Sequence, residues 1–303
     1  MEDISHIDLL AAYASSWQGI KTSDDPRLTQ YFWEQQRISS GWWRYQRAPE
    51  ATTPYSGRSE TIFWEDGKGA MTEVCQEGAP FRGQSAWERK GVAVHTMSTL
   101  SVTLYGGEKF SADVSIVDPK DQADLAAIWC YCQSLEYVSE VRKIDRALRV
   151  TNTALTKVPF DLAHWQAVAA EKYPNGLPEP HSDDPTQWLF KGDIPTSTDP
   201  LHVAVARLLG YRWPDQPKED AVADPFVDDD GIVCIPALRT EAPAVERLRE
   251  LLRVCYGQVW SDAILRACPK CEVLAPESFD HEVDHGNFNE RLATLDGPLV
   301  LLR

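Results

Sequence analysis

The sequence of 303 residues lacks several features that would assign it to a common class of protein. No segment approaches the roughly 18 consecutive apolar residues that a membrane-spanning helix requires. Residues 1–10 carry acidic side chains where a secretion signal would begin with basic ones. We therefore expect a cytoplasmic protein with no membrane partner, whose seven cysteines are reduced thiols and not a disulfide framework.

Catalytic motifs are also missing. A methyltransferase acting on an amino group of a base would show a glycine-rich loop for S-adenosylmethionine and an Asn/Asp-Pro-Pro-aromatic tetrapeptide. The sequence contains neither, and no Ser/His/Asp or Cys/His arrangement has support beyond composition. We expect no catalytic residue and no cofactor-binding residue in this chain.

Two patterns have the residue types of metal sites. Glu50 followed by Asp66-Gly67-Lys68 is a distant version of the acid-x-Lys pattern of nucleases, and a charged turn is the favoured interpretation. Cys268-Pro-Lys-Cys271 with His281 and His285 has nearly the spacing of a zinc finger. Its middle gap is short and no apolar pattern of a finger surrounds it, so unpaired thiols and surface histidines are favoured. We expect no metal site.

Positive charge is scarce overall, because the chain has a formal net charge of -16. Such a balance argues against a nucleic-acid partner, which needs clustered Lys and Arg. The charges are unevenly spread, however: residues 179–230 are strongly acidic, whereas basic residues outnumber acidic ones from Arg27 to Arg58. The overall charge therefore does not exclude DNA binding.

Aromatic residues, in contrast, are abundant in the first hundred residues, where they indicate short elements packed by large rings. From Val92 to Val117 apolar and polar residues alternate as in strands, with a turn at Gly106-Gly107. Apolar residues then recur at three- and four-residue steps from Leu125 to Leu148, which predicts one long amphipathic helix or two consecutive ones.

Three arginines share a helical spacing at the end of this segment. Arg142, Arg146 and Arg149 are separated by four and three residues, so on a continuous helix they would lie on one face. They lead into RVTNTALTKVPF, residues 149–160, where hydroxyl and amide groups stand between Arg149 and Lys157. Asn152 suits a base edge and the cations suit phosphates. The alternative is an Asn/Thr turn after a helix whose C-terminus favours arginine.

Several segments together resemble the target-recognition region of large bacterial adenine-specific DNA methyltransferases. These are fused type II restriction-modification enzymes and phage-defence methyltransferases of the BREX and DISARM type. The first segment is similar to the family's QGI-x-TGDN-x-RF signature, from which Ser23 and Asp25 depart. The matching segments are QGIKTSDDPRL (18–28), YFWE (31–34), GRSETIFWE (57–65), SVTLYGGEKF (101–110), AIWC (127–130), RVTNTALTKVPF (149–160), DPTQWLF (184–190), VAVARLLGYRWP (203–214) and DGIVCIP (230–236).

The resemblance implies sequence recognition on double-stranded DNA, as the specificity part of a restriction-modification or phage-defence system. An adenine methyltransferase catalytic domain or subunit would be the partner, and S-adenosylmethionine would be the cofactor of that partner. The alternative is a protein-interaction module or an inactive remnant of such an enzyme. The expected DNA contacts are Arg44, Arg47, Arg58, Arg142, Arg146, Arg149, Asn152 and Lys157.

The expected fold is α+β, with a small mixed sheet and flanking helices followed by a mostly helical C-terminal part. Residues 1–165 would form the target-recognition region. Residues 166–230 would be a linker with one helix and an acidic, flexible loop, and residues 231–303 a small helical module.

Overall fold

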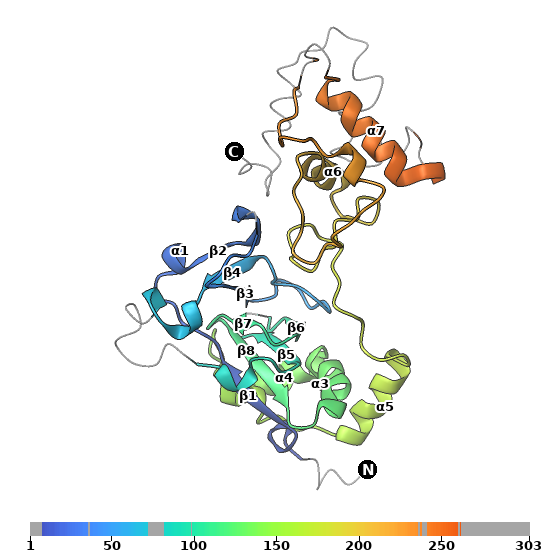
Figure 1. The fold of residues 1–303 in the computed structure, drawn as a ribbon. Coiled ribbons are helices and arrows are strands. Elements are labelled where there is room, and N and C mark those ends of the chain that lie inside the picture. Colours follow the sequence, from blue (N-terminus) through green and yellow to red (C-terminus); the bar gives the residue numbers. More distant parts are fainter. Residues whose placement is uncertain are drawn as a thin grey trace. The chain divides into compact units, whose positions relative to one another are not determined.

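The computed structural model describes residues 8–261, except 36, 72–81, 98, 236, 238–240 and 260. These residues divide into two compact units, one within Met1–Phe32 and Ile38–Pro180 and the other within Trp33–Arg37 and His181–Arg303. The fold is α+β, as the sequence predicts (Figure 1). No helix among the described residues has the length and apolar character needed to cross a membrane.

The first sheet of the first unit is antiparallel. Its strand order is β1-β8-β5-β6, formed by β1 (Ala14–Gln18), β8 (Val114–Pro119), β5 (Gly91–His95) and β6 (Val102–Tyr105). Val92 and Val94 belong to the core under the helices, and Ala93 between them belongs to the core on the opposite face. The alternation seen from Val92 to Val117 thus places apolar residues on both faces of a covered sheet.

The second sheet is mixed. Its order is β2-β4-β3-β7, formed by β2 (Thr29–Tyr31), β4 (Glu60–Phe63), β3 (Trp42–Gln46) and β7 (Lys109–Phe110). The β3–β7 pair is parallel and the other two pairs are antiparallel. The predicted turn at Gly106-Gly107 connects β6 in the first sheet to β7 in the second, and Gly107 has a φ of +110°. Glycine adopts this backbone conformation without strain.

Helices α3 (Leu125–Cys132), α4 (Leu135–Ile144) and α5 (Leu162–Lys172) belong to the first unit, where α3 packs on β5 and α5 packs on α3 (Figure 1). The predicted helical segment is therefore two consecutive helices. The Ser134 hydroxyl begins the second by accepting a hydrogen bond from the amide of Tyr137 at 3.1 Å. Helix α4 ends at Ile144, because Asp145 has an extended backbone.

In the second unit, helix α6 (Pro200–Leu208) packs on helix α7 (Ala244–Tyr256). The remaining elements of the described chain are short. Helix α1 (Asp25–Leu28) has a single turn. Turns of 3-10 helix span Leu10–Ala12, Phe32–Glu34, Glu65–Gly67, Gln84–Ala86, Gln122–Asp124, Asn152–Leu155, Asp224–Phe226 and Gly257–Val259.

The two units do not share the boundaries drawn from the sequence. The boundary at residue 165 falls inside α5, whose whole length belongs to the first unit. The boundary at 230 falls between α6 and α7, which pack together in the second unit. Beyond Ile38 the chain passes from the first unit to the second at Pro180-His181, within the proline-rich segment that separates α5 from α6.

Candidate nucleic-acid interface

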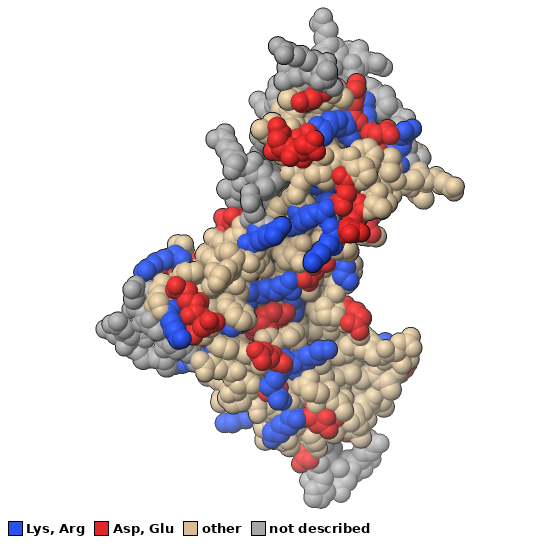
Figure 2. Space-filling model, in the orientation of Figure 1, with Lys and Arg blue, Asp and Glu red and all other residues tan. Residues whose placement is uncertain are grey.

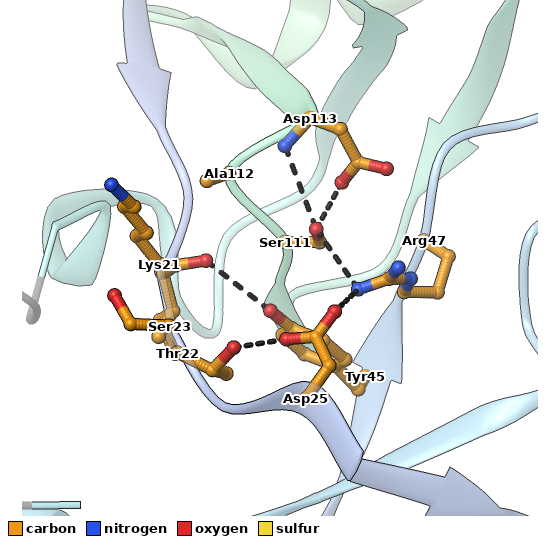
Figure 3. A pocket seen from close by; sticks show the side chains of 10 residues that line it. Lys21, Thr22, Ser23, Asp25, Tyr45, Arg47, Ser111, Ala112 and Asp113 are labelled. Carbon is orange, nitrogen blue, oxygen red and sulfur yellow. Dashed lines mark hydrogen bonds and ion pairs between the residues drawn. The ribbon is translucent and has the colours of Figure 1, made fainter. Parts of the chain in front are cut away.

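A pocket of about 380 Å³ lies in the first unit, where the segment after β1 meets the turn between β7 and β8 (Figure 3). Residues at the end of β3 form the rest of its wall. The lining residues are Ile20, Lys21, Thr22, Ser23, Asp25, Tyr45, Arg47, Ser111, Ala112 and Asp113. The volume falls within the ~300–1,000 Å³ of ligand pockets, and most of the lining side chains are polar or charged.

Gly19 allows the two segments of the pocket to approach each other. A Cβ atom at this position would lie 2.2 Å from the carbonyl oxygen of Ser111 and 2.3 Å from that of Phe110. The next amide, that of Ile20, donates to the Phe110 carbonyl at 2.8 Å. A side chain at position 19 would therefore push the wall containing residues 20–25 away from the turn at 111–113.

A chain of hydrogen bonds connects the polar groups of the pocket (Figure 3). The Arg47 guanidinium donates from Nη1 to Asp25 Oδ2 at 3.2 Å and to Ser111 Oγ at 3.3 Å. The Ser111 hydroxyl in turn donates to Asp113 Oδ1, and the Thr22 hydroxyl donates to Asp25 Oδ1. Cationic, neutral and anionic groups are thus held in one continuous network.

Arg47 carries the positive charge at the centre of this network and is 27% exposed. A second ion pair joins its Nε to Glu60 Oε1 at 3.5 Å. Burial lowers the pKa of Arg47, but Glu60, Asp113 and Asp25 outweigh that effect and raise it above its usual value. Burial also raises the pKa of Glu60, and Arg47 opposes that shift. The guanidinium therefore stays charged beside a solvent-accessible pocket.

The segment at residues 149–160 reaches the rim of the same pocket. The Arg149 guanidinium donates from Nη2 to the carbonyl oxygen of Ala112. The Val150 amide donates to Thr96 O at 2.8 Å, and the Thr96 amide donates to Asp113 O at 3.0 Å. Residues 149–160 and the segment at residues 20–25 thus meet at one pocket.

The interior of RVTNTALTKVPF anchors it to the core. Val150, Leu155, Val158 and Phe160 are buried, whereas Lys157 is exposed. The amide nitrogen Nδ2 of half-buried Asn152 donates to the Ser16 carbonyl at 3.3 Å, and the Thr151 amide donates to Asp145 Oδ2 at 2.9 Å. Because the Asn152 amide is already bonded within the first unit, these contacts favour the turn interpretation for Asn152 over a contact with a base edge.

The expected stripe of three arginines on one helical face is wrong. Only Arg142 lies on α4, since the helix ends at Ile144 and Asp145 is extended. Arg142 is half-buried and donates to the carbonyl of Ala147, while Arg146 and Arg149 follow the helix and are exposed. The spacing alone gave no sign of the break, because residues 145–149 kept the apolar periodicity of a helix.

Arg58 is also not available to DNA, because its side chain is 1% exposed. Its Nη2 donates to the Leu104 carbonyl at 2.7 Å and its Nε lies 3.6 Å from Glu108 Oε1. Burial lowers the pKa of Arg58, and Glu108 opposes that shift. Arg58 therefore links β6 to the segment before β4, while Arg44 on β3 is half-buried and Arg47 lies in the pocket.

Sequence reasoning did not find Lys21, Ser111 or Asp113, although Lys21 lies in the first matching segment. It also missed Lys109, whose ammonium lies 3.8 Å from the ring centre of Trp43 and 4.4 Å from that of Trp87. Neither grouping has a local motif, because its members come from segments far apart in the sequence.

The two metal-like patterns have different outcomes. Residues 65–67 form a short turn, in which Glu65 and Asp66 have φ angles of 46° and 56°, so the charged-turn interpretation holds for that pattern. No group of three or more His, Cys, Asp or Glu within the described ranges has the geometry of a metal site. The Cys268–His285 pattern lies outside those ranges.

Comparison with models of known protein families finds no match, and none of the curated proteins matches the chain.

Proposed function

We propose that the chain recognises a DNA sequence as the specificity part of a site-specific adenine N6 methyltransferase in a restriction-modification or phage-defence system. It would hold double-stranded DNA in the cytoplasm while a partner catalytic domain or subunit flips the adenine. S-adenosylmethionine would bind to that partner and not to this chain. The pocket of the first unit is the observation that carries the proposal.

The pocket supports the family resemblance because one of its walls comes from a matching segment and a second matching segment reaches its rim. Lys21, Ser23 and Asp25 lie in QGIKTSDDPRL, and Arg149 on the rim lies in RVTNTALTKVPF. Ser23, where the family signature has glycine, has a φ of 59°. This left-handed conformation favours glycine.

Gly57, the first residue of the matching segment GRSETIFWE, is at a position where the backbone requires glycine. It has a φ of +70°, and a Cβ atom there would lie 2.4 Å from the carbonyl oxygen of Arg47. GRSETIFWE therefore also supports the pocket, since it begins with the glycine that packs against the backbone of a lining residue.

The first unit is the less acidic of the two, which supports DNA binding there rather than in the second unit. That unit contains 17 Lys and Arg against 23 Asp and Glu, whereas the second contains 13 against 23. On the face shown in Figure 2, cationic side chains lie next to acidic ones and do not form an extended surface of one sign. We therefore expect modest electrostatic affinity, with recognition concentrated at the pocket.

The groups around the pocket suit DNA chemistry. Lys21, Arg146, Arg149 and Lys157 are exposed cations that suit phosphate oxygens, which position a protein on the duplex. Hydroxyl, guanidinium and carboxylate groups inside the pocket suit hydrogen bonds to base edges. Both kinds of contact are needed by a protein that chooses a sequence.

The test is selection of duplexes from a random pool by the immobilised chain, at about 50 mM and about 200 mM salt. We expect enrichment of one sequence motif, with affinity reduced by Arg149→Ala but not by Arg253→Ala. Arg253 is the matched control, because it is 61% exposed and lies on α7 of the second unit. Enrichment of no motif at either salt concentration would rule the proposal out.

A protein-interaction module is the second candidate function. Leu135 at the start of α4 is 88% exposed, and Leu148 beyond its end is 70% exposed. Large exposed apolar side chains are typical of surfaces that bind protein. This candidate predicts that the chain enriches no DNA motif.

A further inference from the structure

We infer that Asp113 reads an exocyclic amino group of a base, either N6 of adenine or N4 of cytosine, in the major groove. This inference rests on the proposed function, because it names the chemical group that the same pocket would recognise. The two oxygens of the Asp113 carboxylate have different surroundings.

Oδ1 of Asp113 accepts the hydrogen bond of the Ser111 hydroxyl. Within the part of the chain that the structure describes, no donor reaches Oδ2. Figure 3 shows this oxygen turned away from Ser111. The backbone of Asp113 is fixed by Thr96, whose amide and hydroxyl both donate to the Asp113 carbonyl oxygen at 3.0 Å. The carboxylate is therefore held in place with one acceptor position unused.

Cations on two sides of this acceptor would bring it close to a DNA backbone. Arg47 bonds the same Ser111 hydroxyl at 3.3 Å, and Arg149 bonds the adjacent carbonyl of Ala112. Exposed Lys21 lies on the opposite wall of the pocket. Cations bound to phosphates on both sides would direct the carboxylate toward the base edges between them.

The chemistry of the groove then limits the partner of Oδ2. An ionised carboxylate only accepts hydrogen bonds, so the facing group has to be a donor. In the major groove the donors are the amino groups of adenine and cytosine, whereas guanine O6 and N7 and thymine O4 are acceptors. A phosphate or an acceptor edge opposite Asp113 would leave two acceptors facing each other. Adenine or cytosine is therefore expected at one position of the recognised sequence.

The test uses duplexes that carry the motif selected by the full chain. Each adenine in turn is replaced by purine and each cytosine by 2-pyrimidinone, which removes only the exocyclic amine. At one position we expect the unmodified chain to bind ~5- to 150-fold more weakly after this replacement. The affinity of the Asp113→Ala variant should fall less than about twofold after the same replacement, because the variant already lacks the hydrogen-bond acceptor. The position that responds distinguishes adenine from cytosine.

Glu136→Ala is the control, since it removes an exposed carboxylate from α4 of the same unit and should keep the full sensitivity. Asp113→Asn provides a second readout that does not depend on the stability of the alanine variant. Its amide can also donate, so selection with this variant should accept guanine or thymine at the position concerned.

The outcomes separate this inference from the proposed function. If the chain selects a motif but Asp113→Ala keeps the full sensitivity, or no amine matters at any position, Asp113 does not read the base and the DNA function stands. Unchanged selection by Asp113→Asn leads to the same conclusion. If the chain selects no motif at all, both the proposed function and this inference are wrong.

Discussion

The two units use the same ionic groups for different purposes, as two arginines show. Arg47 in the first unit pairs with Asp25 and Glu60 and is 27% exposed at the wall of a pocket. Arg207 in the second unit pairs with Asp220 at 2.8 Å and Asp224 at 3.0 Å, and is 1% exposed. Depth of burial, and not the composition of the cluster, makes one network accessible to a ligand and the other a support for the fold.

The acidic, flexible loop that the sequence predicts at residues 215–230 is held to the rest of the second unit by ion pairs with arginines. Asp220 and Asp224 bind Arg207, Asp224 also binds Arg212, and Asp228 binds Arg247. The loop is thereby joined to α6 and α7, which hold Arg207 and Arg247 respectively. A count of acids along the sequence could not show this, because the partners lie 12 to 19 residues away.

The largest expected effect comes from Arg207→Met in the second unit. This change removes one partner of a buried network and should cost about 3 kcal/mol of folding free energy. That value is at the low end for buried pairs, because the side chains of Asp220 and Asp224 are each 30% exposed. Urea denaturation would measure the loss. The control is Arg212→Met, which is 39% exposed and should cost no more than ~1 kcal/mol; equal losses would contradict the distinction between the two sites.

Gly19→Ala should have the next largest effect, this time in the first unit. The added methyl group would meet two backbone carbonyls, so the backbone itself would have to shift, at a cost of ~1–3 kcal/mol. Gly106→Ala is the control, because there the new atom meets only the flexible side chain of Glu108. Thermal unfolding of both variants checks the expectation, and a Gly19→Ala variant as stable as Gly106→Ala would show that the pocket walls are not held by this approach.

The sequence predicted the elements of the first unit better than its site. Alternation at Val92–Val117 and helical spacing from Leu125 identified the strands and helices correctly, because these patterns reflect local burial. Arg58 was expected to contact DNA, since nothing local shows that its guanidinium binds Leu104 and Glu108 in the interior. Asp113 and Ser111 went unnoticed because the pocket forms only when β1, β3 and the β7–β8 turn come together.

Lowering the pH should remove the stability that Asp228 contributes to the second unit. The hydrogen bond from Arg247 lowers the pKa of Asp228 from 3.8 to about 2. The stability that this carboxylate contributes is therefore present above about pH 4 and is lost as the pH falls toward 2. Asp228→Asn should lower the thermal midpoint at pH 6 and leave it close to that of the unmodified chain at pH 2. A deficit that stays constant between these pH values would argue against this linkage.

The smallest effect is expected for Lys21→Ala at the pocket of the first unit. If Lys21 neutralises one phosphate, its loss should reduce the slope of log affinity against log salt by about 0.9. The selected sequence should not change, because phosphate contacts carry little information about bases. Fluorescence anisotropy from 50 to 200 mM salt would measure the slope, with Lys218→Ala in the second unit as the control. An unchanged slope for Lys21→Ala would remove Lys21 from the proposed interface.

Photocrosslinking tests most directly whether the pocket of the first unit is the place where DNA binds. A benzophenone side chain would replace Lys21 on the pocket wall or, separately, exposed Lys218 in the second unit. Each protein would then be irradiated with the selected duplex. The account predicts a DNA crosslink from position 21 and none from position 218. A crosslink from position 218 alone would contradict it.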